Sequence, residues 1–271
     1  MKKVIAALDN SLAAKPVLTT AVALARLLGA AVEPVHVQAN GDRVARSTAE
    51  AAGFPLRTLR GSVLDRLSEV GQREDTAALV LGARGTPLGR RPLGSTALAV
   101  ASSLAKPVVI VPPDAEAALI LRRALVPLEA GVSSALAPRA IVELAQGTEL
   151  DVIVLHVHEE ASLPLFTDQP QHEQPAWARE FLRRYCPWGI GAVRLEIRVG
   201  RSEELVPLVA EQTDADLIAL GWAQQLVPGR APVVRATLER ARTPIMLVPV
   251  EVTPPVASHA GEAPSAVVPR L

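Results

Sequence analysis

The strongest constraint on the fold of this chain is an internal duplication. Two pairs of segments show it most clearly: Ala77–Gly82 resembles Asp216–Gly221, and Lys106–Pro112 resembles Thr243–Pro249. Three further pairs occur in the same order: Val4–Ser11 with Ala124–Gly131, Val35–Val37 with Leu155–Val157, and Leu59–Ser62 with Arg198–Ser202. A unit this long exceeds the repeats of solenoid proteins. The 271 residues therefore predict two copies of one domain.

Short apolar runs alternate with segments of helical period in both halves. Strands are expected at 3–8, 31–37, 55–60, 77–82 and 107–111, and again at 124–128, 151–157, 192–199, 216–221 and 244–249. Helices are expected at 14–28, 43–52, 63–74 and 95–105, and again at 133–146, 175–184, 203–213 and 232–242. This alternation predicts right-handed βαβ crossovers and parallel sheets, so the fold class is α/β with two tandem doubly wound domains.

Proline-rich segments divide the chain. The predicted domains are 1–113 and 122–252, joined by a linker at 114–121. The second domain carries an insertion at 159–188, interpreted as a loop and a surface helix. The tail at 253–271 is rich in Pro, Ala and Ser without periodicity and is expected to be disordered.

Composition excludes several classes of protein. The formal net charge is zero, which argues against a protein that binds nucleic acid through a basic surface. The single cysteine, Cys186, excludes an intramolecular disulfide and a cysteine-based metal cluster. No apolar segment approaches the ~20 residues of a membrane span. The run Val4–Leu8 is too short for a signal-peptide core, so the expected location is the cytoplasm, without membrane partners.

A glycine-rich loop lies between two buried-strand signals of the first half. Gly82 and Gly85 follow the apolar run 77–81, and Gly94-Ser95-Thr96 opens the next helical segment. Glycines allow close backbone approach, and the free N–H groups of a helix start bind anions. The stretch Gly89–Thr96 resembles a Walker A loop, but Ser95 stands in place of the required Lys. The pattern predicts a phosphate cradle and excludes a P-loop NTPase.

Asp9 follows the first predicted strand. A carboxylate at this place can accept hydrogen bonds from ribose hydroxyls. It can equally cap the next helix or start a turn with Asn10 and Ser11. Because the first and fourth strands flank one crevice in a doubly wound sheet, the nearby glycine cluster favours the ribose interpretation.

With these residues the chain resembles the universal stress proteins, in the tandem form with two such domains. The family signature is Gly-x2-Gly-x9-Gly-[Ser/Thr], and the stretch from Gly82 to Ser95 has eight residues in the second gap. The resemblance implies a five-stranded parallel sheet of order 3-2-1-4-5 with helices on both faces. It also implies ATP, with or without Mg²⁺, bound by Ala7, Leu8, Asp9, Val37, Leu81, Gly82, Arg84, Gly85, Gly94, Ser95 and Thr96.

The second half departs from this pattern. Glu129 replaces Asp9, Gln224 replaces Gly85, Trp222 is expected in the loop, and Gly229-Arg230-Ala231 does not reproduce Gly-Ser-Thr. We expect this half to pack and to support self-association, between the halves or as a homodimer, without binding ATP. His156, His158 and His172 invite a metal hypothesis, but a histidine satisfied by backbone groups is favoured, since closed metal sites need three or four ligands.

Three functions follow from these expectations. The leading one is a stress-response regulatory or sensor module that binds adenine nucleotide and is not an enzyme, or at most hydrolyses ATP slowly. An adenylating enzyme would need a substrate domain, for which the duplication leaves no room. The third is a structural, dimerising protein that binds no nucleotide.

Overall fold

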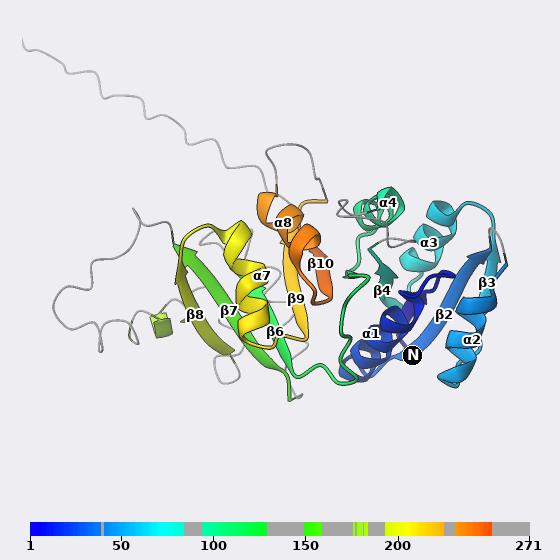
Figure 1. The fold of residues 1–271 in the computed structure, drawn as a ribbon, viewed down its shortest axis with the longest axis horizontal. Coiled ribbons are helices and arrows are strands. Elements are labelled where there is room, and N and C mark those ends of the chain that lie inside the picture. The colour runs from blue at the N-terminus through cyan, green and yellow to red at the C-terminus, as the bar shows by residue number, and fades with distance from the viewer. Residues whose placement is uncertain are drawn as a thin grey trace, which may run out of the picture.

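The ten strands of the described residues form one sheet. The computed structural model describes residues 1–38, 41–83, 94–128, 149–158, 176, 178–180, 182–183, 193–224 and 231–250. Along the sheet the strands lie in the order β3-β2-β1-β4-β5-β10-β9-β6-β7-β8 (Figure 1). The N-terminal half supplies five consecutive strands of this order and the C-terminal half supplies the other five.

The first half has a parallel sheet of order 3-2-1-4-5, as predicted. Its strands are β1 (Lys3–Ala7), β2 (Ala31–Gln38), β3 (Arg57–Arg60), β4 (Thr76–Gly82) and β5 (Val108–Val111). Its helices are α1 (Ala14–Leu27), α2 (Arg43–Ala51), α3 (Val63–Gln72) and α4 (Ser95–Ser103).

The second half repeats this order as β8-β7-β6-β9-β10, again with parallel pairing. Its strands are β6 (Arg123–Pro127), β7 (Asp151–His158), β8 (Val193–Val199), β9 (Leu217–Trp222) and β10 (Ile245–Pro249), and its described long helices are α7 (Ser202–Gln212) and α8 (Pro232–Arg240). Residues 176, 178–180 and 182–183 are helical within the helix expected at 175–184. The helix expected at 133–146, most of the insertion 159–188 and the tail 253–271 lie outside the described residues.

The two halves are joined by the pairing of two predicted strands, β5 and β10, and this pairing was not predicted from the sequence. β10 runs antiparallel to β5, with Ile245 opposite Ile110 and Leu247 opposite Val108. The strands of the two halves therefore run in opposite directions, and their carboxyl ends lie at opposite edges of the sheet. Gln224, just after β9, reaches the amino-terminal side of β5, where its Nε2 donates to the Leu104 carbonyl at 2.6 Å.

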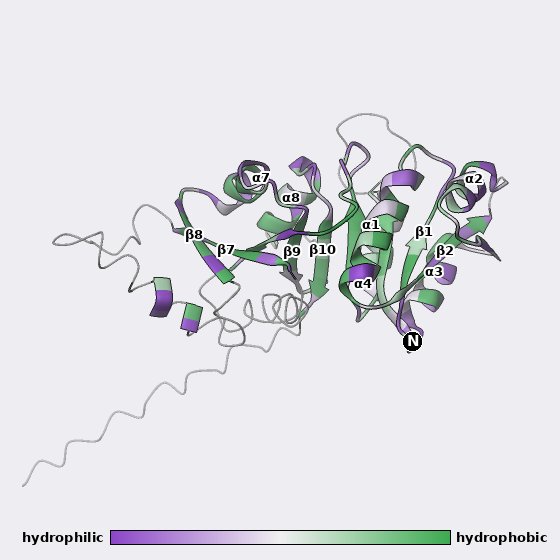
Figure 2. Cartoon of the chain, turned by 90° about the horizontal axis from the view of Figure 1, so that it is seen from below, coloured by the Kyte–Doolittle hydropathy of each residue, from purple (hydrophilic) through white to green (hydrophobic). Residues whose placement is uncertain are grey.

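Helices lie on both faces of the sheet, and buried hydrophobic residues of strands and helices form one cluster on each face. Figure 2 shows the hydrophobic character of the central strands, such as β10. Alternate residues of a strand serve opposite faces. On β1, Val4 packs into the cluster that contains α1 and α2, whereas Ile5 packs into the cluster that contains α3, α4, α7 and α8. Both side chains are fully buried, as expected for a parallel strand covered on both sides.

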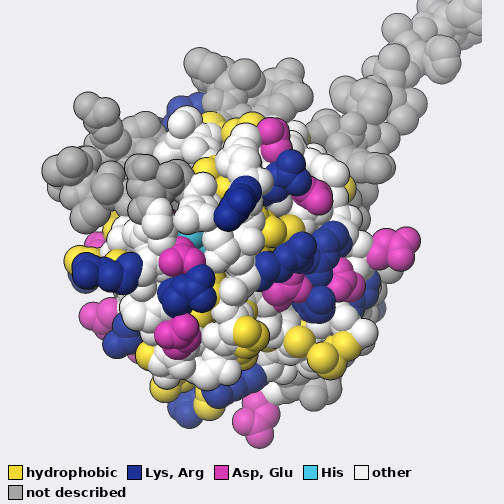
Figure 3. All heavy atoms as spheres, turned by 90° about the vertical axis from the view of Figure 1, so that its right-hand side faces the viewer, with side chains coloured by type: hydrophobic (Ala, Val, Ile, Leu, Met, Phe, Trp, Pro, Cys, Tyr) yellow, Lys and Arg dark blue, Asp and Glu magenta, His cyan; other side chains and the backbone are white. Residues whose placement is uncertain are grey.

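The surface of the first half carries both signs of charge and also exposes large hydrophobic side chains, among them Leu12 and Leu64. On the face formed by the first half, Lys and Arg side chains lie among Asp and Glu side chains (Figure 3). None of the helices among the described residues is long and apolar enough to cross a membrane.

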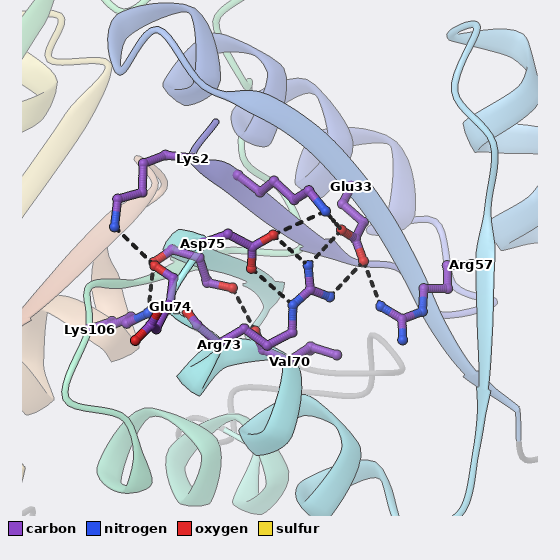
Figure 4. A network of polar contacts seen from close by, with 10 residues as sticks. Lys2, Glu33, Arg57, Val70, Arg73, Glu74, Asp75 and Lys106 are labelled. Carbon is purple, nitrogen blue, oxygen red and sulfur yellow. Dashed lines mark hydrogen bonds and ion pairs between the residues drawn. The ribbon is translucent and has the colours of Figure 1, made fainter.

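A network of charged side chains ties the amino ends of the first-half strands together (Figure 4). Glu33 on β2 accepts from Lys3 Nζ at 2.9 Å, from Arg57 Nη1 at 2.9 Å, and from Arg73 through Nη1 at 2.9 Å and Nη2 at 3.0 Å. Asp75 accepts from Lys3 Nζ and from Arg73 Nε, each at 3.1 Å. Because these cations come from β1, β3 and the turn before β4, the carboxylate of Glu33 links β2 to both of its neighbouring strands and to the turn that leads into β4.

This network lowers the pKa of its carboxyls. The hydrogen bonds from Arg73 are the largest cause, and they help to lower the pKa of Glu33 to about 2. Arg73 and then Lys3 also hold the pKa of Asp75 below its usual value. A carboxyl whose pKa is lower in the folded than in the unfolded chain stabilises the fold above its unfolded pKa. That stabilisation disappears as the pH falls toward the folded pKa.

Replacing Glu33 by Gln tests this network. The change should lower the free energy of unfolding at pH 7 by roughly 1–2 kcal/mol, because a charge-assisted acceptor of three cations is lost. In the variant, the free energy of unfolding should also decrease less between pH 4.5 and pH 2, which is the range between the usual and the lowered pKa of Glu33. Urea unfolding over a pH series measures both effects.

The matched control is Glu69→Gln, since Glu69 pairs with Arg66 on α3 with a side chain that is 62 % exposed. The control should change neither quantity measurably. An acid-stability curve that is the same in Glu33→Gln and in the unchanged protein would contradict the role given to Glu33.

Candidate functional site

The first half contains a cavity of about 310 Å³ at the carboxyl ends of β1, β2 and β4. The order of the strands reverses between β1 and β4, and open α/β sheets bind ligands at such a point. The lining combines the ends of these strands with the first turns of α3 and α4. The lining residues are Ala7, Leu8, Asp9, Val35, His36, Val37, Val63, Leu67, Leu81, Gly82, Ala83, Gly94, Ser95, Thr96 and Ala97.

The residues that the sequence proposed for the site largely come together in this cavity. Ala7, Leu8, Asp9, Val37, Leu81, Gly82, Gly94, Ser95 and Thr96 all line it. Arg84 and Gly85 lie outside the described residues. Other lining residues, among them Val63 and Leu67 of α3, were not predicted from the sequence. A signal for them exists, because Ser62 marks the start of α3 by accepting a hydrogen bond from Asp65 N–H.

Asp9 takes part in a turn and also lines the cavity. Its Oδ1 accepts from Ser11 N–H at 3.0 Å and from the Ser11 hydroxyl at 2.6 Å, and Ser11 Oγ accepts from Ala13 N–H at 3.1 Å. The turn interpretation is therefore correct for Oδ1. The turn does not use Oδ2, so the same carboxylate keeps an acceptor for a ligand.

His36 fixes the end of β2 against the end of β1. Its Nδ1 lies 2.8 Å from the Leu8 carbonyl oxygen and its Nε2 lies 2.8 Å from the Gly41 carbonyl oxygen. Leu8 N–H in turn donates to the Val35 carbonyl at 2.8 Å. These contacts place the buried His36 ring between two backbone carbonyls, at the end of the strands that line the cavity.

Helix α4 begins at the cavity. Its N-cap, Gly94, has φ −56° and ψ 141° and donates its N–H to the Ala83 carbonyl at 2.9 Å. This bond brings Ala83, the residue after β4, next to the start of α4. The first backbone N–H groups of a helix, here those of Ser95, Thr96 and Ala97, have no partner within the helix. Together with the helix dipole they favour an anion.

The second half has a corresponding cavity of about 320 Å³, with a different lining. It is lined by Pro127, Leu128, Leu155, Val157, Ser202, Val206, Leu220, Gly221, Trp222, Ala223, Ala231, Pro232, Val233, Val234 and Val250. Helix α8 starts with Pro232 and Val233 where α4 starts with Ser95 and Thr96.

The expectation that Trp222 lies in a loop was wrong. Trp222 is the last residue of β9 and is 2 % exposed, because the strand extends one residue beyond Gly221. Glu129 and Gly229, also cited as departures, lie outside the described residues.

The two histidines of β7 contact a backbone carbonyl or each other. His156 Nδ1 lies 2.9 Å from the Leu128 carbonyl oxygen, as His36 does from Leu8. The His156 and His158 rings meet edge to face at 4.2 Å, and burial lowers the pKa of His158. Within the described residues no group of three His, Cys, Asp or Glu side chains could hold a metal ion. His172 and Cys186 lie outside those residues.

Solved structures with this architecture span nearly the whole chain. A functionally unknown protein from Pseudomonas aeruginosa PAO1 is 13 % identical, with a TM-score of 0.63, and the match covers 92 % of this chain and 93 % of that one. A universal stress protein from Archaeoglobus fulgidus DSM 4304 is 15 % identical, with a TM-score of 0.62 and coverage of 92 % and 96 %. A putative universal stress protein from Pseudomonas aeruginosa UCBPP-PA14 is 13 % identical, with a TM-score of 0.61 and coverage of 92 % and 94 %. These likenesses support the fold. No curated protein matches the sequence.

The family comparison agrees with the duplication. The model of the universal stress protein family matches residues 43–112 and, separately, residues 121–249. The second match spans β6 to β10, whereas the first begins at α2 and omits β1 and β2. Since the family model matches twice and covers more than half of the sequence, the chain belongs to the universal stress protein family in its tandem two-domain form.

Proposed function

We propose that the first half binds an adenine nucleotide, ATP with or without Mg²⁺, and that the protein acts as a stress-response regulatory or sensor module. One observation carries this proposal. A carboxylate, Asp9, and the N-terminus of α4 line the same cavity of about 310 Å³. A nucleotide needs acceptors for its ribose hydroxyls and donors for its phosphates, and these two groups supply them.

The lining divides into three parts that fit the three parts of a nucleotide. Apolar side chains such as Leu8 and Val37 offer a surface for the base. Asp9 Oδ2 accepts from ribose hydroxyls while Oδ1 remains held by Ser11. The N–H groups and hydroxyls at the start of α4 receive the phosphates. Gly82 has no side chain, which lets the ligand approach the backbone.

The second half does not offer the same donors. Pro232 has no backbone N–H and Val233 has no hydroxyl, so the start of α8 lacks what Ser95 and Thr96 supply at the start of α4. Nucleotide binding is therefore assigned to the first half alone. The described lining does not favour catalysis of ATP hydrolysis. Asp9 is the one carboxylate among the described lining residues, and we assign it to the ribose rather than to the phosphates.

The variant Ser95→Pro tests the phosphate cradle. Proline is tolerated at the first position of a helix, and Gly94 already has the extended ψ that a residue before proline prefers. The change removes one N–H and one hydroxyl, so ATP affinity should fall by roughly 10- to 100-fold. Calorimetry on the full chain measures this, with an unchanged melting temperature as evidence of folding.

The control for the cradle is Ser202→Ala, which removes a hydroxyl from the lining of the second-half cavity at the start of α7. It should leave ATP affinity unchanged. ATP affinity that is unchanged in Ser95→Pro would contradict the phosphate cradle at the start of α4. If the purified protein does not bind nucleotide at all, the alternative of a structural protein without nucleotide is favoured instead.

Ser11→Ala tests the positioning of Asp9. The variant removes the hydroxyl that donates to Oδ1, so the carboxylate loses one of its two restraints. Affinity for ATP should fall by roughly three- to tenfold, whereas inorganic phosphate or a ribose-free phosphate should bind unchanged. Ser47→Ala, on exposed α2, serves as the control. Equal weakening of both ligands would place Asp9 elsewhere than at the ribose.

Hydrolysis of ATP should be far below the median enzyme turnover of ~10 per second. The described lining offers no carboxylate for a base at the phosphate end, and binding that is equal in ground and transition states does not accelerate the reaction. Steady-state phosphate release with Mg²⁺ measures it. Turnover of several per second that Ser95→Ala abolishes would make the protein an ATPase.

A further inference from the structure

We propose that His36 is a proton-binding switch beside the first-half cavity. With a proton on both ring nitrogens it fastens the connection between β2 and α2 to the end of β1, and loss of one proton loosens this contact. The proton site follows from the contacts of the ring. Its effect on a ligand rests on the nucleotide site proposed above, and a measurement without nucleotide separates the two.

Both ring nitrogens of His36 face carbonyl oxygens. Nδ1 lies 2.8 Å from the Leu8 oxygen, and Nε2 lies 2.8 Å from the Gly41 oxygen. A neutral imidazole has one N–H group and one lone pair, so it can donate to only one of these oxygens and would turn its lone pair toward the other. The imidazolium ion has two N–H groups and can donate to both. The position of the ring is therefore that of the protonated form.

Burial and neighbouring groups act on this charge in opposite directions. His36 is 6 % exposed, and burial disfavours an ion that has left water. The two carbonyl acceptors favour the ion, and so does the Asp42 carboxylate, whose charge interacts with that of His36. The hydrogen bond from Arg46 is the largest cause that holds the pKa of Asp42 below its usual value, so this carboxylate stays charged. These opposed effects make the two ring contacts sensitive to pH.

The other ionisable groups on the surrounding elements are carboxyl, ammonium and guanidinium groups, which ordinarily keep their charge between pH 6 and pH 8. Thr58, opposite His36 on β3, is uncharged and donates to Asp42 Oδ2 at 3.2 Å. Among the described residues of these elements the ionisable side chains are Asp9 and Lys15 near the start of α1, Glu33 on β2, Asp42, Arg43, Arg46 and Glu50 at α2, Arg57 and Arg60 on β3, and Asp65 and Arg66 on α3.

The Gly41 carbonyl connects the ring to residues that line the cavity. It accepts a second hydrogen bond, from Asn10 Nδ2 at 2.9 Å, and Asn10 Oδ1 accepts from a backbone N–H in the first turn of α2 at 3.1 Å. Asn10 follows Asp9, and the other acceptor of the ring belongs to Leu8. Both Leu8 and Asp9 line the cavity. Loss of a ring proton therefore loosens a contact next to the residues assigned to the base and the ribose.

Nuclear magnetic resonance of the ligand-free full chain tests the switch itself. Labelling of the histidine rings with ¹⁵N shows how many ring nitrogens carry a proton. The Asp42 amide reports on the Gly41 carbonyl, because the two belong to one peptide group. Between pH 5 and pH 8 the second ring proton of His36 should be lost, and the Asp42 amide signal should shift with the same midpoint. A constant number of ring protons over this range, or a titration that leaves the Asp42 amide unmoved, overturns the proposal.

The variant His36→Gln separates the ring proton from other groups. Glutamine keeps an amide donor for one carbonyl but does not change its charge, so the pH-dependent shift of the Asp42 amide should vanish. His156→Gln is the matched control, since His156 makes the same contact with the Leu128 carbonyl oxygen in the second half, and it should keep the shift. A shift that survives in His36→Gln, or that only His156→Gln removes, overturns the proposal. The titration of the unchanged chain stands by itself if His36→Gln lowers the melting temperature markedly.

Calorimetry with ATP tests the effect of the proton on the ligand. The ratio of the ATP affinity at pH 6 to that at pH 8 should be roughly threefold or more larger in the unchanged chain than in His36→Gln, because the protonated ring fixes the neighbouring lining. The ionisation of ATP itself is the same in both titrations and cancels in this comparison. Equal ratios overturn the effect on the ligand. Absence of ATP binding in both proteins, with the shift of the Asp42 amide retained, leaves the proton switch intact and counts against the nucleotide site alone.

Discussion

Burial of parallel strands on both faces is the constraint on which the rest of this structure depends. Val4 and Ile5 are neighbours on β1, yet they pack into different clusters on opposite sides of the sheet. Helices must therefore cover both faces of the sheet. Because the strands of each half are parallel, the chain must cross back over the sheet between one strand and the next, and each strand begins at the same edge of its half. At the reversal of strand order, the connections that follow β1 and β4 leave the sheet in opposite directions. The cavity forms between the carboxyl ends of these two strands as a consequence of the topology.

The two halves use this topology for cavities of different character. Backbone contacts around His36 and His156 are the same, whereas the first residues of α4 and α8 differ, and Ala83 is matched by Trp222. The cavity itself therefore depends on strand ends that the core requires for stability. The polar character of the lining differs between the halves at the first residues of α4 and α8.

The sequence predicted most of the elements because its periodicity reflects burial. The apolar runs predicted the strands within about two residues, whereas the sheet order was implied by the resemblance to the universal stress proteins and is found in both halves. The pairing of β5 with β10 was not predictable, since periodicity shows that a strand is buried but not which edge lies beside it. Trp222 was placed in a loop because Gly221 was taken as the end of a strand, although a large aromatic residue favours strand structure. For Asp9 the residue type left a turn and a ligand contact open, and the pattern Asp-x-Ser could have shown that one oxygen serves the turn.

The mutual pairing of β5 and β10 leaves β3 and β8 as the outermost strands of the sheet. Both carry exposed arginines, Arg57 and Arg60 on β3 and Arg194 on β8. An unpaired strand edge is a template for aggregation, and charged side chains along it oppose the addition of another strand. The most apolar edge strand of each half is thus paired inside the molecule. The charged side chains on the two edges that remain oppose the association of molecules into fibres.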